Sequence, residues 1–302
     1  MNPIRRLLYP IPLLALLMTG CSTENISDRL YTQSIGIGGG QRITLHGLAF
    51  DETMPFSGSG ASAAEALAHA EAQQGGRIFL GHTELLCLDG SRTLESCRRL
   101  LTEQGLSPAC KVICADLPDV FGEGRSEALL QSVRMAEKNG LLAVTDLSTA
   151  LDEWLGQKQT ALLPAVTGDA EGMVLLHEDG TRTALSEEAV RGLFWLRAHG
   201  SEPVNVTLGS ADITVLQCHL DTDVEIQADV LTLVYSLTVR SEDCPSSLRT
   251  TAAAHILQQC TAAAEEMLAA DADVIGMETL LAAHGIGDMP SRLRIRTEVM
   301  VQ

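Results

Sequence analysis

Apolar residues recur along the chain with two different periods, and their pattern predicts both helices and strands. Residues 30–37 and 42–50 read as strands, and Gly38, Gly39 and Gly40 between them predict a hairpin turn. Residues 36–41 also resemble a dinucleotide-binding loop, but they lack a glycine at the sixth position and a strand follows them. The hairpin is therefore the favoured interpretation.

The rest of the first half predicts helices interspersed with strands. In residues 146–155, Leu147, Ala150 and Trp154 share one helical face, and Thr145 is the predicted N-cap. We expect Trp154 to anchor a core rather than to bind a ligand. By the same criteria, helices are expected at residues 63–74, 92–104 and 125–139, strands at 77–88 and 109–115, and a loop at 57–60.

The second half begins with a hairpin-like segment and continues into several strands. Ser186 is a predicted N-cap, and Glu187 and Glu188 behind it suit the positive end of a helix dipole. Strands are expected at 172–177, 204–208, 213–220, 224–228, 230–240 and 293–301, and helices from 187 towards Gly200, at 248–270 and up to His284.

Residues 157–172 contain Pro164 and Gly168 and form the best candidate domain boundary. Consecutive strands with helices set beside them predict an α+β class, with a mixed or antiparallel sheet and its helices in each domain. The expected organisation is a leader at 1–20, a first domain at 21–165 and a second domain at 166–302.

The leader has the pattern of an export signal. Arg5 and Arg6 precede a short leucine-rich stretch that Pro10 and Pro12 interrupt, too short to span a membrane. It ends in small residues before Cys21, which resembles the lipobox of bacterial lipoproteins. That resemblance implies a diacylglyceryl group on Cys21, cleavage before it, and a body anchored by acyl chains such as palmitate on the outer face of a membrane.

Composition narrows the function classes. The chain is 45% hydrophobic, enough for a substantial core, but only 3% aromatic, which is sparse for a cleft lined with stacking rings. Removing the two leader arginines lowers the formal charge from −18 to −20. So acidic a chain argues against nucleic acid as a partner and leaves membrane attachment to the lipid.

Seven cysteines remain after Cys21, and an odd number cannot all pair. Most lie in apolar surroundings, where a free thiol behaves as a small hydrophobic group. Cys110 and Cys114 would lie on one strand about 13 Å apart, too far to share a metal. We therefore expect neither a metal site nor a cofactor.

Two polar features could carry chemistry. His82 sits in an apolar stretch, where we expect a core residue more than a ligand. His219, Asp221, Asp223 and Glu225 alternate with apolar residues and are expected to form a solvated strand face rather than an acid–base or metal cluster. No nucleophile with a base and no phosphate loop is recognisable, so no catalytic residue is predicted.

Several segments, in order and spacing, resemble the Ger(x)C family of spore-germination lipoproteins, the C subunits of nutrient germinant receptors. After the lipobox, residues 28–37 are similar to the family's opening strand, and residues 77–86 to its apolar strand with an embedded histidine. Residues 172–196 resemble the hairpin and helix that open its C-terminal region, and residues 273–276 its acid-to-glycine motif. The chain departs from the family in its short length and in Gly38–Gly40, which replace an acidic turn.

The resemblance implies a non-enzymatic subunit that works with membrane A-type and B-type subunits at the outer surface of the spore inner membrane. By hypothesis, the exposed face of the C-terminal sheet, with Arg294 and Arg296, docks on those subunits. Two other classes stay open: a solute-binding lipoprotein of a transporter, and a cell-envelope hydrolase whose site would include His82 or the face from His219 to Glu225.

Overall fold

The computed structural model describes residues 29–50, 55–90, 94–122, 125–139, 141–142, 146–167, 170–197, 204–208, 211–227, 230–287 and 293–302. Cys21 and the predicted leader lie outside these residues. Within the described ranges, no helix is both long and apolar enough to cross a membrane.

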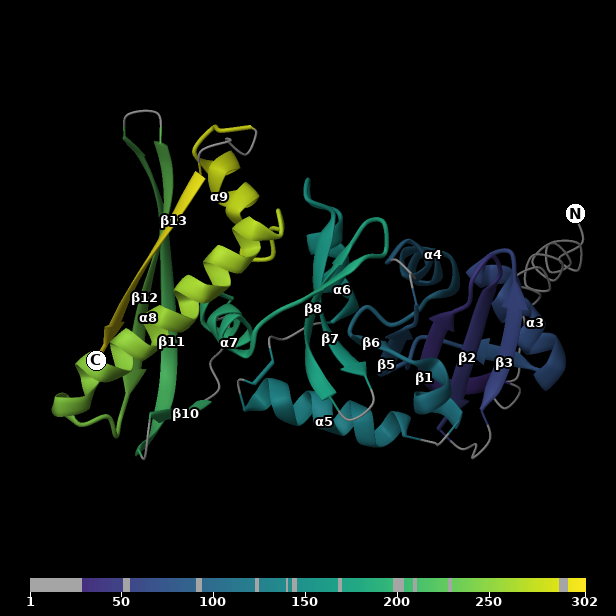
Figure 1. The fold of residues 1–302 in the computed structure, drawn as a ribbon. Coiled ribbons are helices and arrows are strands. Elements are labelled where there is room, and N and C mark those ends of the chain that lie inside the picture. Colours follow the sequence, from purple (N-terminus) through teal and green to yellow (C-terminus); the bar gives the residue numbers. More distant parts are fainter. Residues whose placement is uncertain are drawn as a thin grey trace, which may run out of the picture.

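A mixed sheet occupies the first half of the protein (Figure 1). Its strands run in the order β3-β2-β1-β5-β6-β7-β8-β9, and β4 also pairs with β1. The central strands β1, β5, β6 and β7 are parallel, while β2, β3, β8 and β9 are antiparallel to their neighbours. The strands are β1 (Arg29–Gly38), β2 (Ile43–Ala49), β3 (Phe56–Gly60), β4 (Arg77–Phe79), β5 (Leu85–Leu88), β6 (Lys111–Ala115), β7 (Thr160–Thr167), β8 (Ala170–His177) and β9 (Arg182–Ala184).

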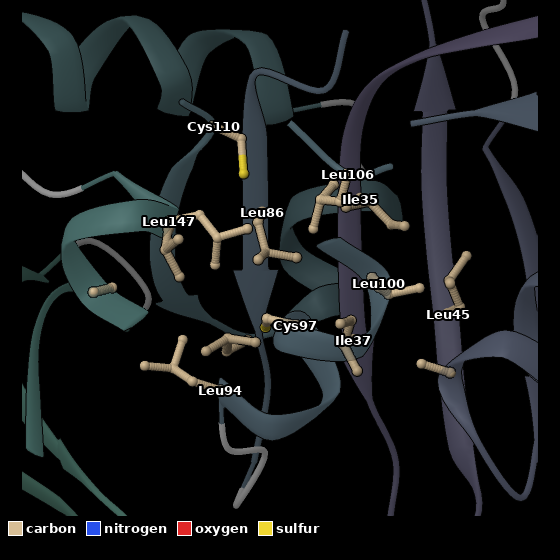
Figure 2. Packing of buried hydrophobic residues seen from close by; sticks show 14 of the residues in the cluster. Ile35, Ile37, Leu45, Leu86, Leu94, Cys97, Leu100, Leu106, Cys110 and Leu147 are labelled. Carbon is tan, nitrogen blue, oxygen red and sulfur yellow. The ribbon is translucent and has the colours of Figure 1, made fainter. Parts of the chain in front are cut away.

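Helices cover both faces of this sheet. On one face, α3 (Ala63–Gln74), α4 (Leu94–Gln104) and α6 (Leu147–Trp154) enclose the first core with β1, β2 and β5. Figure 2 shows the centre of that core, where Ile35 and Leu86 of the sheet lie among Leu94, Leu100 and Leu147. On the other face, η2 (Pro118–Gly122) and α5 (Ser126–Lys138) pack on β5 and β6.

The predicted hairpin at Gly38–Gly40 is confirmed, because β1 and β2 pair antiparallel across it. Gly39 has a φ of +91°, a conformation that glycine adopts without steric cost. The predicted loop at 57–60 is wrong, since these residues lie in β3. An added Cβ at Gly58 would come within 2.0 Å of the Ala66 oxygen, so the glycine lets α3 lie directly on the strand.

The predicted single strand at 77–88 is wrong as well. It divides into β4 and β5, which pair with successive parts of β1. A turn closed by the Thr83 N–H donating to the Leu80 oxygen separates them, and a bulge in β1 follows Thr32. The break lets both short strands pair with the same long neighbour.

A second sheet, with strand order β10-β11-β12-β13, forms the other end of the molecule (Figure 1). The predicted strands 213–220 and 224–228 are one continuous strand, β11, whereas β10, β12 and β13 lie where they were expected. The strands are β10 (Val204–Leu208), β11 (Ala211–Gln227), β12 (Val230–Ser241) and β13 (Leu293–Val301), and the helices are α7 (Glu187–Leu196), α8 (Ser246–Ala269) and α9 (Met277–Ala283).

Of the two predicted N-caps, Ser186 is confirmed, whereas Thr145 lies outside the described residues. Ser186 caps α7 as expected, and its hydroxyl accepts from the Ala189 N–H at 3.1 Å. The cap of α6 is Asp146 rather than Thr145; its carboxylate accepts from the Thr149 N–H at 2.8 Å. A carboxylate also suits the positive end of the helix dipole.

The expected boundary between residues 165 and 166 falls inside β7. Residues up to Ala184 continue the first sheet through β8 and β9, and Pro164 lies in β7 opposite Met173 instead of in a linker. If the chain is divided according to its two sheets, the boundary between the two parts therefore follows β9.

The β7–β8 hairpin belongs to both halves. Leu163 and Leu176 lie in the first core, while Leu162 and Leu175 on the opposite face lie in a second core with α7, α8 and β12. The α+β class is confirmed, with one hairpin shared between two packed bodies.

Candidate docking surface

The second sheet has one covered face and one open face. The side chains of Leu231, Leu233, Tyr235, Leu237 and Val239 on β12 point into the second core, which α7 and α8 complete. The opposite face carries His219, Asp221, Asp223 and Glu225 on β11, and Arg294, Arg296, Glu298 and Met300 on β13. We call these eight residues the open face.

The β11 residues are solvated, as the alternation predicted. The side chains of His219 and Asp221 are 69% and 71% exposed, with 3.2 Å between Nε2 and Oδ1. Among the described residues, no group of three or more His, Cys, Asp or Glu side chains is placed to hold a metal ion.

Arg296 connects the two outer strands of the open face across β12. Its guanidinium donates to Glu225 Oε2 at 2.9 Å and Oε1 at 2.5 Å, and to Glu298 Oε1 at 3.1 Å. The hydrogen bond from Arg296 lowers the pKa of Glu225. The charge of Arg296 is thus matched within the face, whereas among the described residues no ion pair holds the exposed side chain of Arg294.

His82 does not lie where the sequence suggested. The expectation of a core residue is wrong: the side chain is exposed, in the turn between β4 and β5. Its ring lies 5.7 Å from that of Tyr31 and 5.4 Å from that of Phe79. His82 lies in a turn of the first sheet and the β11 residues lie in the second sheet, so the structure does not bring the two sequence candidates together.

The seven cysteines after Cys21 are free, and six of them are buried. Burial raises the pKa of Cys110 and Cys260 to about 12, and that of Cys114 and Cys218 to about 11. Thiols of this kind stay protonated and act as small apolar groups, as the sequence indicated.

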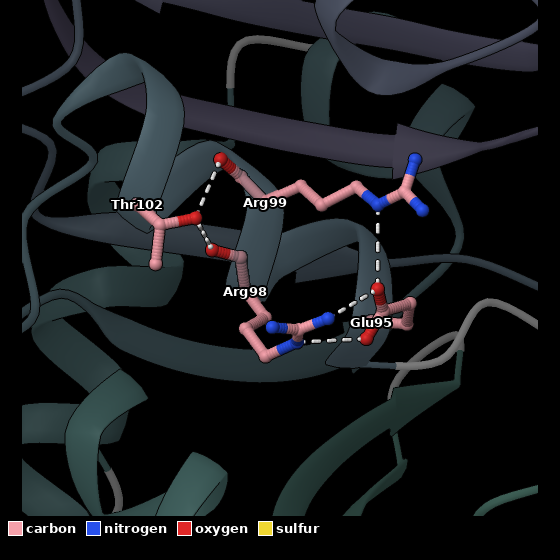
Figure 3. Close-up of polar contacts among 4 residues, drawn as sticks. All are labelled: Glu95, Arg98, Arg99 and Thr102. Carbon is pink, nitrogen blue, oxygen red and sulfur yellow. Dashed lines mark hydrogen bonds and ion pairs between the residues drawn. The ribbon is translucent and has the colours of Figure 1, made fainter.

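A charged cluster on α4 is a solvated helix surface (Figure 3). Glu95 accepts from Arg98 at 2.8 and 2.9 Å and from Arg99 at 3.3 Å, and the hydroxyl of Thr102 donates back to the Arg98 carbonyl. These pairs are three or four residues apart on one helix, and their side chains are 37–59% exposed. Such pairs contribute little to stability.

Sequence reasoning missed a buried ion pair between the two bodies. Glu153 of α6 lies 2.6 Å from Arg197, which follows α7, and it also accepts from the Leu162 N–H at 2.9 Å. Burial raises the pKa of Glu153 to about 7 against the opposing effect of Arg197, and Asp273 raises it further. Nothing in the local sequence could have paired these two residues.

Asp273 belongs to the acid-to-glycine motif and has a structural role. Its carboxylate accepts from the backbone N–H groups of Met277 at 2.8 Å and Glu278 at 2.7 Å, at the start of α9. Glu278 in turn accepts from the Gln157 N–H at 2.8 Å, next to α6. The motif therefore positions α9 against the first body.

One solved structure shares this arrangement over nearly the whole chain. The crystal structure of the GerBC protein matches with a TM-score of 0.54 over 89% of this chain and 96% of that chain, at 11% sequence identity. No family model matches the sequence, and no curated protein matches it. At this identity the likeness concerns the fold, and it confirms that the protein has a Ger(x)C-like fold.

Proposed function

We propose that this Ger(x)C-like protein is a lipid-anchored, non-enzymatic subunit of a spore germinant receptor that acts with A-type and B-type membrane subunits. The observation that carries the proposal is the extent of the fold match, 89% of this chain and 96% of GerBC. The match covers both bodies, and so it is more specific support for the proposal than a match over one common domain would be.

The leader supports the location. A lipobox before Cys21 is consistent with a body held outside the membrane by acyl chains, at the outer surface of the spore inner membrane.

The open face is the surface that we assign to the membrane subunits. Helices cover both faces of the first sheet, whereas the open face presents carboxylates on β11 and arginines on β13. Such a face fits a partner with complementary charges, which gives specificity and a fast association rate. Arg294 is the better residue to test, because Arg296 is already bound to Glu225 and Glu298.

The test is affinity purification of the tagged protein from detergent-solubilised membranes of spores, followed by mass spectrometry. We expect recovery of a multi-span subunit and a second membrane subunit, with acyl groups on Cys21. The Arg294→Glu variant is expected to recover less of both, because its reversed charge repels the complementary surface.

The control is Arg99→Glu, which reverses an exposed arginine on α4 at the other body and should leave recovery unchanged. Equal recovery by both variants would contradict the assigned face. Recovery of a transporter permease instead of receptor subunits would support the solute-binding alternative, and an unmodified Cys21 would contradict the lipid anchor.

A further inference from the structure

A row of aromatic side chains lies where β1 begins, on β4, on β1 and at the residue that follows β2. Tyr31 of β1 is in register with Phe79 of β4, and their ring centroids are 5.5 Å apart. On the other side, the Phe50 N–H donates to the Tyr31 oxygen at 3.1 Å, one position beyond the pair Thr32 and Ala49. Residues opposite one another in a sheet share a face, so the three side chains lie on one surface.

His82 extends this row, because its ring lies 5.7 Å from Tyr31 and 5.4 Å from Phe79. We call Tyr31, Phe50, Phe79 and His82 the aromatic patch. In a chain that is only 3% Phe, Trp and Tyr, three such residues stand side by side here.

The patch is open to solvent. Phe50 is 47% exposed, His82 is exposed, and Tyr31 and Phe79 are half-buried. The helix that covers this face of the sheet, α5, contacts β1 through a hydrogen bond from Gln33 to Glu127, two residues beyond Tyr31. The first residues of β1, including Tyr31, therefore lie beyond the part of the strand that α5 contacts.

Two arginines border the patch on the same face. Arg29 is in register with Arg77, two residues before Tyr31 and Phe79, and its guanidinium carbon lies 5.8 Å from the Phe79 ring centroid. This places two cations beside exposed rings in a chain with a formal charge of −18.

The position of the patch along the chain limits its distance from the anchor. Arg29 follows Cys21 by eight residues, and eight residues span at most about 29 Å when fully extended. The part of the body that the tether meets first is thus the part that carries the aromatic patch.

We propose that the aromatic patch, with Arg29 and Arg77, rests in the headgroup region of the bilayer to which the protein is tethered. Aromatic rings with a polar edge favour the boundary between lipid tails and water, and arginine stems lie along apolar surface while their charges reach the headgroups. The contact orients the body on the membrane. The inference rests on the proposed function only through the anchor at Cys21.

The experiment supplies the anchor artificially, so that its outcome does not depend on lipidation or on receptor membership. Residues 21–302 with Cys21→Ser and an N-terminal hexahistidine tag are bound to phosphatidylcholine vesicles that contain nickel-chelating lipid. Phe50→Trp places a reporter in the patch, and brominated phosphatidylcholine quenches tryptophans that reach the acyl boundary, about 5–10 Å below the surface. The matched control is Met300→Trp on β13, 58% exposed at the opposite end of the molecule (Figure 1).

On binding to the vesicles, the added emission of Phe50→Trp is expected to shift to the blue, because the ring enters a less polar environment. Brominated lipid is expected to quench this emission and to leave that of Met300→Trp unchanged. The emission of Trp154 and Trp195, both nearly buried, is subtracted with the parent protein. His82→Trp is a second reporter should Phe50→Trp fold poorly, as thermal unfolding would show. Equal quenching at both ends, or none at the patch, would overturn the proposal.

Discussion

Glu153 is the residue at which burial and charge compete most directly. Its carboxylate is held by Arg197 and by the Leu162 N–H, yet burial still raises its pKa to about 7. The folded protein therefore binds this proton more tightly than the unfolded chain, whose glutamate titrates near 4.5. Ionisation of Glu153 accordingly lowers the free energy of unfolding as the pH rises through this interval.

We expect the Glu153→Gln variant to become more stable relative to the wild type as the pH rises from 4.5 to about 7. Glutamine does not ionise, so the variant avoids the decrease in the free energy of unfolding that the wild type shows in this interval. Leaving Arg197 without its carboxylate adds a constant difference in stability, which does not change this dependence on pH. Urea unfolding below and above the interval measures the difference. A difference that is independent of pH would contradict the burial argument.

Glu95→Gln is the matched control with the opposite sign. Hydrogen bonds from Arg98 lower the pKa of Glu95, so its contribution is present above the ordinary pKa and is lost at lower pH. The Glu95→Gln variant should thus become less stable relative to the wild type, by free energy of unfolding, as the pH rises through the acidic range.

Single residues were predictable where their partners are near in sequence. Ser186 bonds to Ala189, and the solvated character of Asp221 and Glu225 follows from alternation within one strand. His82 was mispredicted because its apolar neighbours belong to two different strands, and the turn between them carries it outward. Glu153 was missed because its partner, Arg197, lies at the end of another helix, 44 residues further along the chain.

At the scale of elements, α7 and α8 approach each other closely at a glycine. An added Cβ at Gly192 would lie 2.0 Å from the Gln259 oxygen and 2.8 Å from the Ala263 Cβ. Near this contact, Trp195 donates from Nε1 to the Gln259 side chain at 2.8 Å, inside the second core. The glycine sets the spacing of the two helices and, through it, that hydrogen bond.

We expect Gly192→Ala to lower the free energy of unfolding by about 1–3 kcal/mol, because forcing atoms into a packed contact shifts the backbone. The gain of about 1 kcal/mol from a better helix former offsets only part of this cost. Thermal or chemical unfolding gives the value. Gly40→Ala, with no atom within 4 Å of its added Cβ, is the control and should be near neutral, and a stabilised Gly192→Ala would refute the contact.

The sequence predicted correctly the elements whose apolar residues have a strong period. It did not predict those whose form depends on packing against neighbouring elements. Residues 63–74 are the helix α3 as expected, and the long helix and the final strand also lie where the pattern put them. The strand β3 was taken for a loop because Gly58 and Gly60, which look like turn residues, are selected by the approach of α3. The strands β4 and β5 pair with β1 on either side of its bulge, which local sequence does not reveal.

At the scale of the whole molecule, the β7–β8 hairpin couples the two cores. Leu162 and Leu163 are adjacent, both fully buried, and face opposite cores. Each core contains one tryptophan, Trp154 in the first and Trp195 in the second. The molecule therefore has a natural reporter on each side of the shared wall.

We expect the two cores to unfold together. The variants Trp154→Phe and Trp195→Phe each keep one tryptophan, which reports on one core. A further substitution made in both variants should shift their urea midpoints equally, because the hairpin cannot leave one core without opening the other. Leu163→Ala, which costs about 2–5 kcal/mol, should lower both midpoints although it faces only the first core. A shift confined to the Trp195→Phe background, whose remaining reporter is Trp154, would show that the cores are independent.

The sequence by itself determined what short-range physics controls: helices and strands of strong period, the hairpin at Gly38–Gly40, the cap at Ser186 and the α+β class. Its segment order also indicated the Ger(x)C-like fold that the structure shows. Only the tertiary structure decided how far the first sheet extends, which hairpin the cores share, and that Glu153 meets Arg197. These features depend on neighbours distant in sequence, whose proximity is set by packing and not by any local preference.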